Sequence, residues 1–160
     1  MKIGVMSDSH GDKDAIRQAA ARAGQVDLWL HAGDYCQDAV FLGRIASVPV
    51  ITVAGNCDGS AQVRPDEFMN ALDKKIWLTH GHRYKVKQNQ DELIWWAGQY
   101  GVDIVVYGHT HVADILRQDQ VLAFNPGSVA FPRVGSPSFG LIEIVFGDKA
   151  EAQIVYLKGR

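Results

Sequence analysis

The chain has 160 residues, of which 47% are hydrophobic, so its size and composition fit one domain with a substantial core. Its 16 Lys and Arg residues against 18 Asp and Glu residues give a net charge of -2, and without a basic block the sequence offers no platform for nucleic acid. No apolar stretch is long enough to span a bilayer, and the N-terminus lacks the pattern of a signal peptide. We therefore expect a single domain over residues 1–160 that is cytoplasmic and makes no membrane contact.

Short apolar strands alternate with helical segments over the first two thirds of the sequence. Strands are predicted at residues 2–6, 27–31, 50–53, 75–78 and 103–107. Helices are predicted between Asp12 and Gly24, at residues 38–47 and at residues 91–100. Residues 59–72 have weak periodicity and contain Pro65, which predicts a loop with at most one helical turn.

The last third of the sequence is rich in β-structure. Two hairpins are predicted, one from residues 112–117 and 121–124, the other from residues 138–145 and 152–157, each around a short polar turn. The sequence therefore predicts an α/β fold in which the helices belong to the first two thirds.

Each of the five strands in the first two thirds ends in a short loop that contains glycine and carries Asp, Asn or His. The polar residues of these loops are Asp8, His10, Asp34, Asn56, His80, His82, His109 and His111. Because ligands of open α/β sheets bind outside the carboxyl ends of the strands, we expect these side chains to converge on one edge of the sheet. Carboxylates and imidazoles without a set of thiolates suit transition metals such as Mn²⁺, Fe, Co²⁺, Ni²⁺ and Zn²⁺.

Each of these residues alone has a structural interpretation, as a helix cap, a hydrogen-bonded core histidine or a turn residue. A purely structural explanation would have to apply to all five loops at the same time. Two pairs also have a specific spacing, since residues two apart in an extended segment point to the same side. Asp8 with His10, and His109 with His111, can each present two ligands from one loop. The joint pattern favours a metal site.

Five blocks occur in this order in the sequence: Asp8-Ser9-His10, Gly33-Asp34, Gly55-Asn56-Cys57-Asp58, Thr79-His80-Gly81-His82 and Gly108-His109-Thr110-His111. In this order they resemble the calcineurin-like metallophosphoesterase superfamily. The short chain, the Cys after the Asn and the block Asn125-Pro126-Gly127-Ser128 are similar to the small stand-alone YfcE-like phosphodiesterases. The resemblance implies a four-layer αββα sandwich of two packed β-sheets flanked by helices. We expect the two C-terminal hairpins to supply most of the second sheet.

The resemblance also implies two divalent metal ions, with Mn²⁺ the first choice and Ni, Zn, Fe, Co or Mg as alternatives. It assigns the first metal to Asp8, His10, Asp34 and His111. It assigns the second metal to Asp34, Asn56, His80 and His109. The carboxylate of Asp34 would bridge them, which is chemically reasonable because its two oxygens can serve two cations.

Three further residues receive roles beside the metals. His82 is expected to face the cleft and contact substrate or a metal-bound water, as a catalytic residue together with Asp34 and Asn56; the alternative is a polar loop residue. Arg133 is a candidate for binding a phosphate oxygen, or an ordinary surface arginine. Asp58 is expected to orient a ligand or its loop from behind.

Cys57 departs from the pattern of the superfamily, in many members of which a His follows the metal-binding Asn and is thought to help protonate the leaving group. A thiol is a weak hydrogen-bond donor, and we expect Cys57 to be packed as a small buried apolar residue.

The resemblance predicts a phosphodiesterase that hydrolyses small phosphodiesters through a metal-bridging hydroxide. The alternatives are a phosphomonoesterase, a nucleotide pyrophosphohydrolase, or a metal-loaded protein-binding scaffold like the retromer subunit that has this fold. The partner is expected to be a small phosphate ester, and the sequence leaves open whether the chain forms a homo-oligomer.

Overall fold

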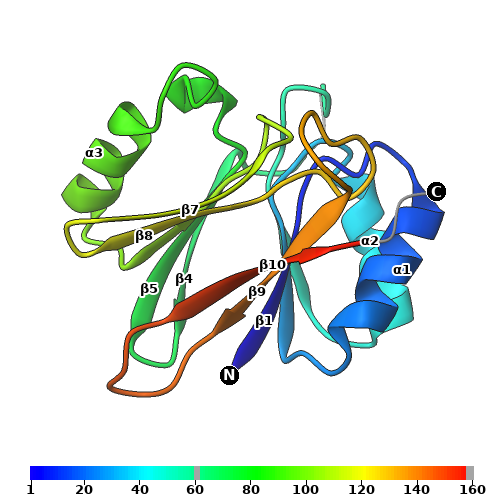
Figure 1. Cartoon of the computed structure of the whole chain (residues 1–160), viewed down its shortest axis with the longest axis horizontal. Coiled ribbons are helices and arrows are strands. Elements are labelled where there is room, and N and C mark those ends of the chain that lie inside the picture. Colours follow the sequence, from blue (N-terminus) through cyan, green and yellow to red (C-terminus); the bar gives the residue numbers. More distant parts are fainter. Residues whose placement is uncertain (60–61, 158–160) are drawn as a thin grey trace.

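The computed structural model describes residues 1–59 and 62–157. Within these residues the chain forms an α/β fold of two mixed five-stranded sheets with three α-helices on their outer faces (Figure 1). None of the helices in the described part of the chain is both long and apolar enough to cross a membrane.

The first sheet has the strand order β10-β9-β1-β2-β3. Its parallel strands are β1 (Lys2–Met6), β2 (Leu28–His31) and β3 (Val50–Thr52), and its antiparallel strands are β9 (Ser138–Glu143) and β10 (Glu151–Tyr156). Helices α1 (Lys13–Ala23) and α2 (Gln37–Ala46) connect the parallel strands. As predicted, the Asp12 side chain caps α1, where it accepts hydrogen bonds from the amides of Asp14 and Ala15.

The second sheet has the strand order β4-β5-β6-β8-β7. Its strands are β4 (Asp66–Ala71), β5 (Lys74–Thr79), β6 (Ile104–Val106), β7 (Ala113–Gln118) and β8 (Val121–Pro126). The short 3-10 helix η1 (His82–Tyr84) follows β5, and α3 (Asp91–Tyr100) leads to β6.

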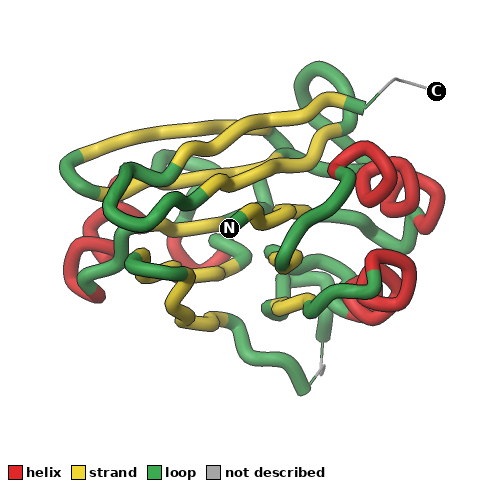
Figure 2. The backbone as a smooth tube through the Cα atoms, turned by 90° about the horizontal axis from the view of Figure 1, so that it is seen from below, coloured by secondary structure: helices red, strands yellow, loops and turns green. Residues whose placement is uncertain are grey.

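Three buried clusters separate four layers. One lies between the two sheets and includes Ile3 and Phe124. A second joins α1 and α2 to the first sheet through Ile16 and Trp29, and a third joins α3 to the second sheet through residues such as Leu93. Figure 2 shows the same arrangement, with the strands between helices on two sides. The predicted αββα sandwich is therefore confirmed.

The prediction for the hairpins was partly wrong. The hairpin of β7 and β8 joins the second sheet, but the hairpin of β9 and β10 extends the first sheet, where β9 pairs with β1. This pairing satisfies an edge of β1 that would otherwise be open.

The loop predicted at residues 59–72 was also wrong in part, because β4 lies there; residues 60 and 61 fall outside the described residues. This strand is stabilised by its partner, with Phe68 stacked on Trp77 of β5 and the Trp77 indole donating to Asp66 at 3.0 Å.

Candidate metal centre

The predicted ligand loops meet at one end of the molecule, but from two sheets. Asp8 follows β1 and Asp34 lies after β2 in the first sheet, whereas His80 follows β5 in the second. Hydrogen bonds join the loops of the two sheets: for example, the His80 ring donates from Nδ1 to the Ala32 carbonyl at 2.7 Å, and the amide of His109 donates to Asp8 Oδ2 at 3.1 Å. The expectation of a single sheet edge is corrected, because the packed sheets present their carboxyl ends side by side.

One group of ligand atoms comes from Asp8, His10, Asp34 and His111, whose nearest donor atoms all lie within 4.8 Å of one another. Asp8 Oδ1 lies 3.2 Å from His111 Nε2, which in turn lies 3.4 Å from His10 Nε2. His10 Nε2 lies 3.8 Å from Asp34 Oδ2. Asp8 is fully buried and Asp34 nearly so.

The hydrogen bond of His111 to Phe131 leaves no proton between the His111 ring and the Asp8 carboxylate. Its Nδ1 lies 2.7 Å from the Phe131 carbonyl, which can only accept, so in the neutral ring the lone pair of Nε2 faces Asp8. Asp8 Oδ1 is buried and accepts no hydrogen bond among the described residues. A buried carboxylate oxygen facing an imidazole lone pair is costly unless a cation lies between them.

The pKa values of the same residues agree with a site that attracts positive charge. The close carboxylate of Asp8 raises the pKa of His111. Burial alone would raise the pKa of Asp8, but His111, His80 and the Ser7 hydroxyl outweigh it, and the pKa is lowered. A divalent cation satisfies this demand without protonating a ligand.

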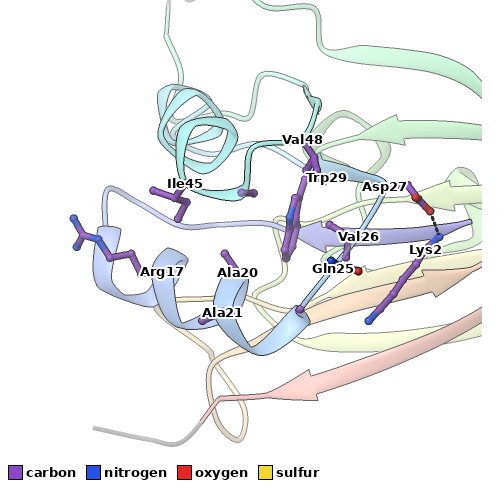
Figure 3. A pocket seen from close by; sticks show the side chains of 12 residues that line it. Lys2, Arg17, Ala20, Ala21, Gln25, Val26, Asp27, Trp29, Ile45 and Val48 are labelled. Carbon is purple, nitrogen blue, oxygen red and sulfur yellow. Dashed lines mark hydrogen bonds between the residues drawn. The ribbon is translucent and has the colours of Figure 1, made fainter.

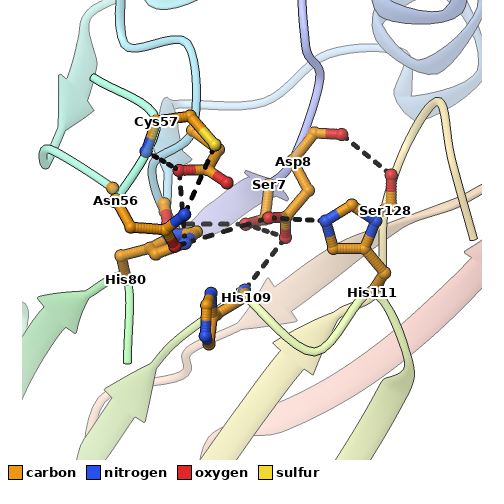
Figure 4. A network of polar contacts seen from close by, with 12 residues as sticks. Ser7, Asp8, Asn56, Cys57, His80, His109, His111 and Ser128 are labelled. Atoms are coloured by element: carbon orange, nitrogen blue, oxygen red, sulfur yellow. Dashed lines mark hydrogen bonds and ion pairs between the residues drawn. The ribbon is translucent and has the colours of Figure 1, made fainter. Parts of the chain in front are cut away.

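A second group faces the other oxygen of Asp34. His80 donates from Nδ1 to a carbonyl, so in the neutral ring the lone pair of its Nε2 points at Asn56 Oδ1, 3.2 Å away, and at Asp34 Oδ1, 3.4 Å away (Figure 4). The ring of His109 lies 5.0 Å from that of His80. Burial, with His80 and Lys87, lowers the pKa of His109 to about 4, so at neutral pH its ring is uncharged and one ring nitrogen has a lone pair for a metal. The structure therefore gathers the donor atoms of Asp8, His10, Asp34 and His111 in one group. It places Asn56 and His80 at the other oxygen of Asp34, with the ring of His109 beside that of His80.

Several of these residues have a strained backbone. Left-handed φ angles occur at Asp8, His10, Asp34, His109 and His111. Such conformations cost of order 1 kcal/mol or more per residue and persist where the surroundings enforce them, often at functional sites. The neighbouring glycines are required by space, since a Cβ on Gly55 would lie 2.1 Å from Asp34 Oδ1 and one on Gly108 would lie 1.9 Å from Ser7 Oγ.

A buried network behind His10 had no signal in the sequence. The Ser9 hydroxyl lies 2.9 Å from His31 Nε2 and donates to Asp38 Oδ2 at 2.6 Å, and the Gly11 amide donates to the same oxygen at 2.8 Å. Asp38 therefore holds the residues on both sides of His10. The sequence predicted Asp38 only as the start of a helix, because a contact over 29 positions leaves no local pattern.

We expect Asp38→Ala to weaken binding of the first cation by about 10–100-fold, as is typical when a group that orients a ligand loop is removed. The measurement is calorimetric titration of the chelated protein with Mn²⁺, with the exposed Asp148→Ala as control. Unchanged affinity in a folded Asp38→Ala variant would show that the loop of His10 is held without Asp38.

The block from Asn125 to Ser128 braces the ligand loops. The Asn125 amide donates to the Gly108 carbonyl at 3.0 Å, next to His109. The Ser128 hydroxyl donates to the Asp8 carbonyl at 2.8 Å (Figure 4). Residue types alone had given this block no role.

Asp58 connects two of the ligand loops through hydrogen bonds. Its Oδ1 accepts from the Cys36 amide at 2.7 Å and its Oδ2 accepts from the Gly55 amide at 2.6 Å. It thus joins the loop of Asp34 to the loop of Asn56.

His82 and Arg133 lie beside the ligands rather than among them. The His82 ring is 5.4 Å from that of His80 and 6.0 Å from that of His109, and its Nδ1 is buried with no hydrogen-bond partner among the described residues. Burial and His80 lower the pKa of His82. Arg133 is exposed, and its amide donates to the His111 carbonyl at 3.1 Å.

The expectation that Cys57 is buried was wrong. Its side chain is exposed at the tip of the loop after β3, while its amide donates to Asp34 Oδ1 at 2.9 Å. Partial desolvation of the sulfur and the nearby Asp34 carboxylate raise the pKa of the thiol to about 11, so the thiol is neutral at pH 7. The Cys57 sulfur accepts a hydrogen bond from the side-chain amide of Asn56 at 3.3 Å.

A separate hollow of about 920 Å³ lies between α1 and α2 and is lined by residues including Ala20, Trp29, Ile45 and Val48 (Figure 3). Lys2 and Asp27 at its rim belong to the amino ends of β1 and β2. It is therefore at the opposite end of the first sheet from the ligand loops.

Comparison with known proteins supports the interpretation of the site. Residues 1–146 match the model of the calcineurin-like phosphoesterase superfamily domain. The probable metallophosphoesterase YsnB of Bacillus subtilis is 34% identical over 137 residues, which are 84% of this chain and 78% of YsnB. The phosphodiesterase MJ0936 of Methanocaldococcus jannaschii is 31% identical over 160 residues, covering 89% of this chain and 93% of that protein.

Solved structures show the same fold. A predicted phosphoesterase from Streptococcus pneumoniae is 28% identical with a TM-score of 0.78, over 96% of this chain and 97% of that one. The Vps29 protein of Entamoeba histolytica, complexed with zinc, is 24% identical with a TM-score of 0.75, over 98% and 99% of the two chains, a likeness in fold alone. The predicted enzyme class, a metal-dependent phosphoric ester hydrolase, is confirmed. The chain belongs to the calcineurin-like phosphoesterase superfamily, in its branch of small YfcE-like and MJ0936-like phosphodiesterases.

Proposed function

We propose that the chain hydrolyses small phosphodiesters at a centre of two divalent cations. The observation that carries this proposal is the pair of ligand groups that share Asp34, with His10 on the side of Oδ2 and His80 on the side of Oδ1. The first cation is assigned to Asp8, His10, Asp34 and His111, and the second to Asp34, Asn56, His80 and His109. Two cations held in this way, when bound, lower the pKa of water and neutralise charge on a phosphoryl group.

The side chains of this site have separate tasks in the proposal. The ligands hold their orientation because a second atom of each is fixed: Nδ1 of His80 and His111 on carbonyls, and Oδ2 of Asp8 on the His109 amide. In the proposal His82, whose ring lies beside those of His80 and His109, contacts the substrate. Arg133 and Lys87, both exposed near the ligands, attract the anionic substrate.

The choice of phosphodiesters rests on the relatives, since MJ0936 is named a phosphodiesterase. The ligand groups themselves also suit phosphomonoesters and pyrophosphates. Manganese as the native metal and a cytoplasmic location remain predictions from the sequence.

We expect activity to disappear on chelation and to return with a divalent transition metal, Mn²⁺ most effectively, because oxygen and nitrogen ligands without thiolate suit it. The assay compares bis(p-nitrophenyl) phosphate, p-nitrophenyl phosphate and a dinucleotide pyrophosphate after EDTA treatment and addition of Mn²⁺, Mg²⁺, Zn²⁺ or Ni²⁺. Faster turnover of the diester than of the other two substrates supports the proposal. Equal rates for the chelated and the loaded protein contradict the metal mechanism, and metal binding without turnover of any ester favours a scaffold.

A further inference from the structure

We propose that Tyr35 and Phe131 form a binding subsite for a planar aromatic substituent of the phosphodiester, such as a nucleobase or an aryl group. The inference rests on the proposed function and names the class of substrate for that site. Neither residue was a candidate in the sequence, since a single aromatic residue in a loop has no distinctive pattern.

Both rings lie beside a metal ligand and are open to solvent. The Tyr35 ring is centred 5.4 Å from the ring of His10, and the Phe131 ring is centred 5.8 Å from it. Tyr35 is 46% exposed and Phe131 is 55% exposed. Binding sites for small molecules combine a few polar groups with aromatic walls of this kind, and the polar groups here are the ligands of the first cation.

The backbone of Phe131 is fixed on both sides. Its amide donates to the Ser128 hydroxyl at 2.7 Å, and its carbonyl accepts from the His111 ring at 2.7 Å. Ser128 in turn donates to the Asp8 carbonyl at 2.8 Å. Because the same bonds orient a metal ligand and the backbone of Phe131, the backbone that carries the ring has a fixed position relative to the ligand group.

The backbone of Tyr35 is held in an unfavourable conformation. It follows Asp34, and the two residues have consecutive left-handed φ angles of 56° and 67°. This conformation is uncommon for a bulky residue and is retained only where the surroundings enforce it. Gly11, on the loop of His10, lies close to the ring: a Cβ atom added to Gly11 would lie 3.8 Å from Tyr35 Cδ1. The turn thus presents the Tyr35 side chain next to His10.

The two oxygens of Asp34 indicate which substituent the rings contact. Oδ2 lies toward His10 and the aromatic pair, whereas Oδ1 accepts from the Cys57 amide. Cys57 stands where many members of the superfamily carry the residue that protonates the leaving group. The aromatic pair lies on the side of His10, so we assign it to the substituent that remains on phosphorus.

A planar occupant fits better than an aliphatic one, because an aromatic ring gains from edge-to-face or offset stacking in addition to its buried area. Stacking of a base on an aromatic side chain does not depend on which base it is. The subsite therefore selects for a planar group. Comparing aryl esters with nucleoside esters shows whether that group is an aryl ring or a nucleobase.

The test varies the remaining substituent while the leaving group stays nitrophenolate. The Mn²⁺-loaded protein is assayed with the p-nitrophenyl phosphodiesters of methanol, cyclohexanol, phenol and thymidine 5′-hydroxyl. We expect kcat/KM for the phenyl or thymidine ester to exceed that for the cyclohexyl ester by about three- to tenfold, the size of an aromatic pair interaction. Whichever of the phenyl and thymidine esters shows the larger preference over the cyclohexyl ester identifies the planar group as an aryl ring or a nucleobase.

Variants then locate the preference. Phe131→Leu and Tyr35→Leu are expected to abolish the preference for planar over cyclohexyl esters, while Phe131→Tyr and Tyr35→Phe retain it. The control is Phe146→Leu, an exposed phenylalanine in the turn between β9 and β10. A binding measurement without turnover accompanies these rates, in which phenylphosphonate and methylphosphonate are titrated calorimetrically into the loaded wild type and Phe131→Leu.

The inference is supported if the planar preference is present in the wild type, lost in both Leu variants and retained in the control, with tighter binding of phenylphosphonate lost in the same way. Equal kcat/KM for planar and cyclohexyl esters overturns it, as does an equal loss on every ester in the Leu variants, which would assign the rings to positioning His10 and His111. If no ester is hydrolysed at all, the proposed function fails, and the phosphonate titration still decides the subsite: equal affinity for the two phosphonates overturns it.

Discussion

Asp34→Asn is expected to lower the rate of phosphodiester hydrolysis by more than about 10³-fold, which corresponds to roughly 4 kcal/mol of lost transition-state stabilisation. The substitution removes a negative charge that both ligand groups share. It also replaces one carboxylate oxygen by an NH₂ group, which cannot coordinate a cation. Since Asp34 is nearly buried, with Oδ1 3.4 Å from His80 Nε2 and Oδ2 3.8 Å from His10 Nε2, no nearby water can easily replace it.

The loss at Asp34 should appear in metal content as well as in rate. Equilibrium dialysis against Mn²⁺ followed by elemental analysis measures the first, and assay with bis(p-nitrophenyl) phosphate measures the second. Asp148→Asn, at an exposed turn, controls for the loss of one carboxylate. If Asp34→Asn keeps full metal content and full rate, Asp34 does not join the two groups.

Cys57→His is expected to raise the rate on esters with alkyl leaving groups by about 10²-fold, at the lower end of what a well-placed general acid contributes. The native thiol has its pKa raised to about 11 and is a weak hydrogen-bond donor, so it protonates a leaving oxygen poorly. The side chain is exposed, which gives the larger imidazole ring space. Esters of p-nitrophenol should gain nothing, because nitrophenolate departs without a proton.

The ratio of two rates tests the proposal for Cys57. Glycerophosphocholine and bis(p-nitrophenyl) phosphate are assayed at equal metal occupancy in the wild type and the His variant. Cys57→Gln serves as control, since its side chain is polar and of similar length but gives up no proton. An unchanged ratio in a folded, metal-loaded His variant means that position 57 is not where the leaving group is protonated.

The sequence was most informative where local chemistry repeats. A polar loop with glycine after each apolar strand was visible without a structure, and it placed Asp8, Asp34 and His80 correctly at the carboxyl ends of strands. The amphipathic helices were equally clear, because their apolar residues recur at helical spacing. The cap at Asp12 and the end of α1 at Gly24 were found from residue type alone.

The features that were missed depend on contacts between distant parts of the chain. Strand β4 is an edge strand whose residues become extended by pairing with β5, and β9 was assigned to the wrong sheet because its partner, β1, lies more than 130 positions away. The hydrogen bonds of Asp38 to the loop of His10 likewise join segments that the sequence does not connect. The exposure of Cys57 follows from which side of its loop faces Asp34, and no pattern in residue types encodes that.

Crystals of the Mn²⁺-loaded protein, measured near the manganese absorption edge, give the most direct test of the two-cation centre. We expect two anomalous peaks on either side of the Asp34 carboxylate, one contacted by Asp8, His10 and His111 and the other by Asn56, His80 and His109. A single peak, or two peaks that do not share Asp34, would contradict the account.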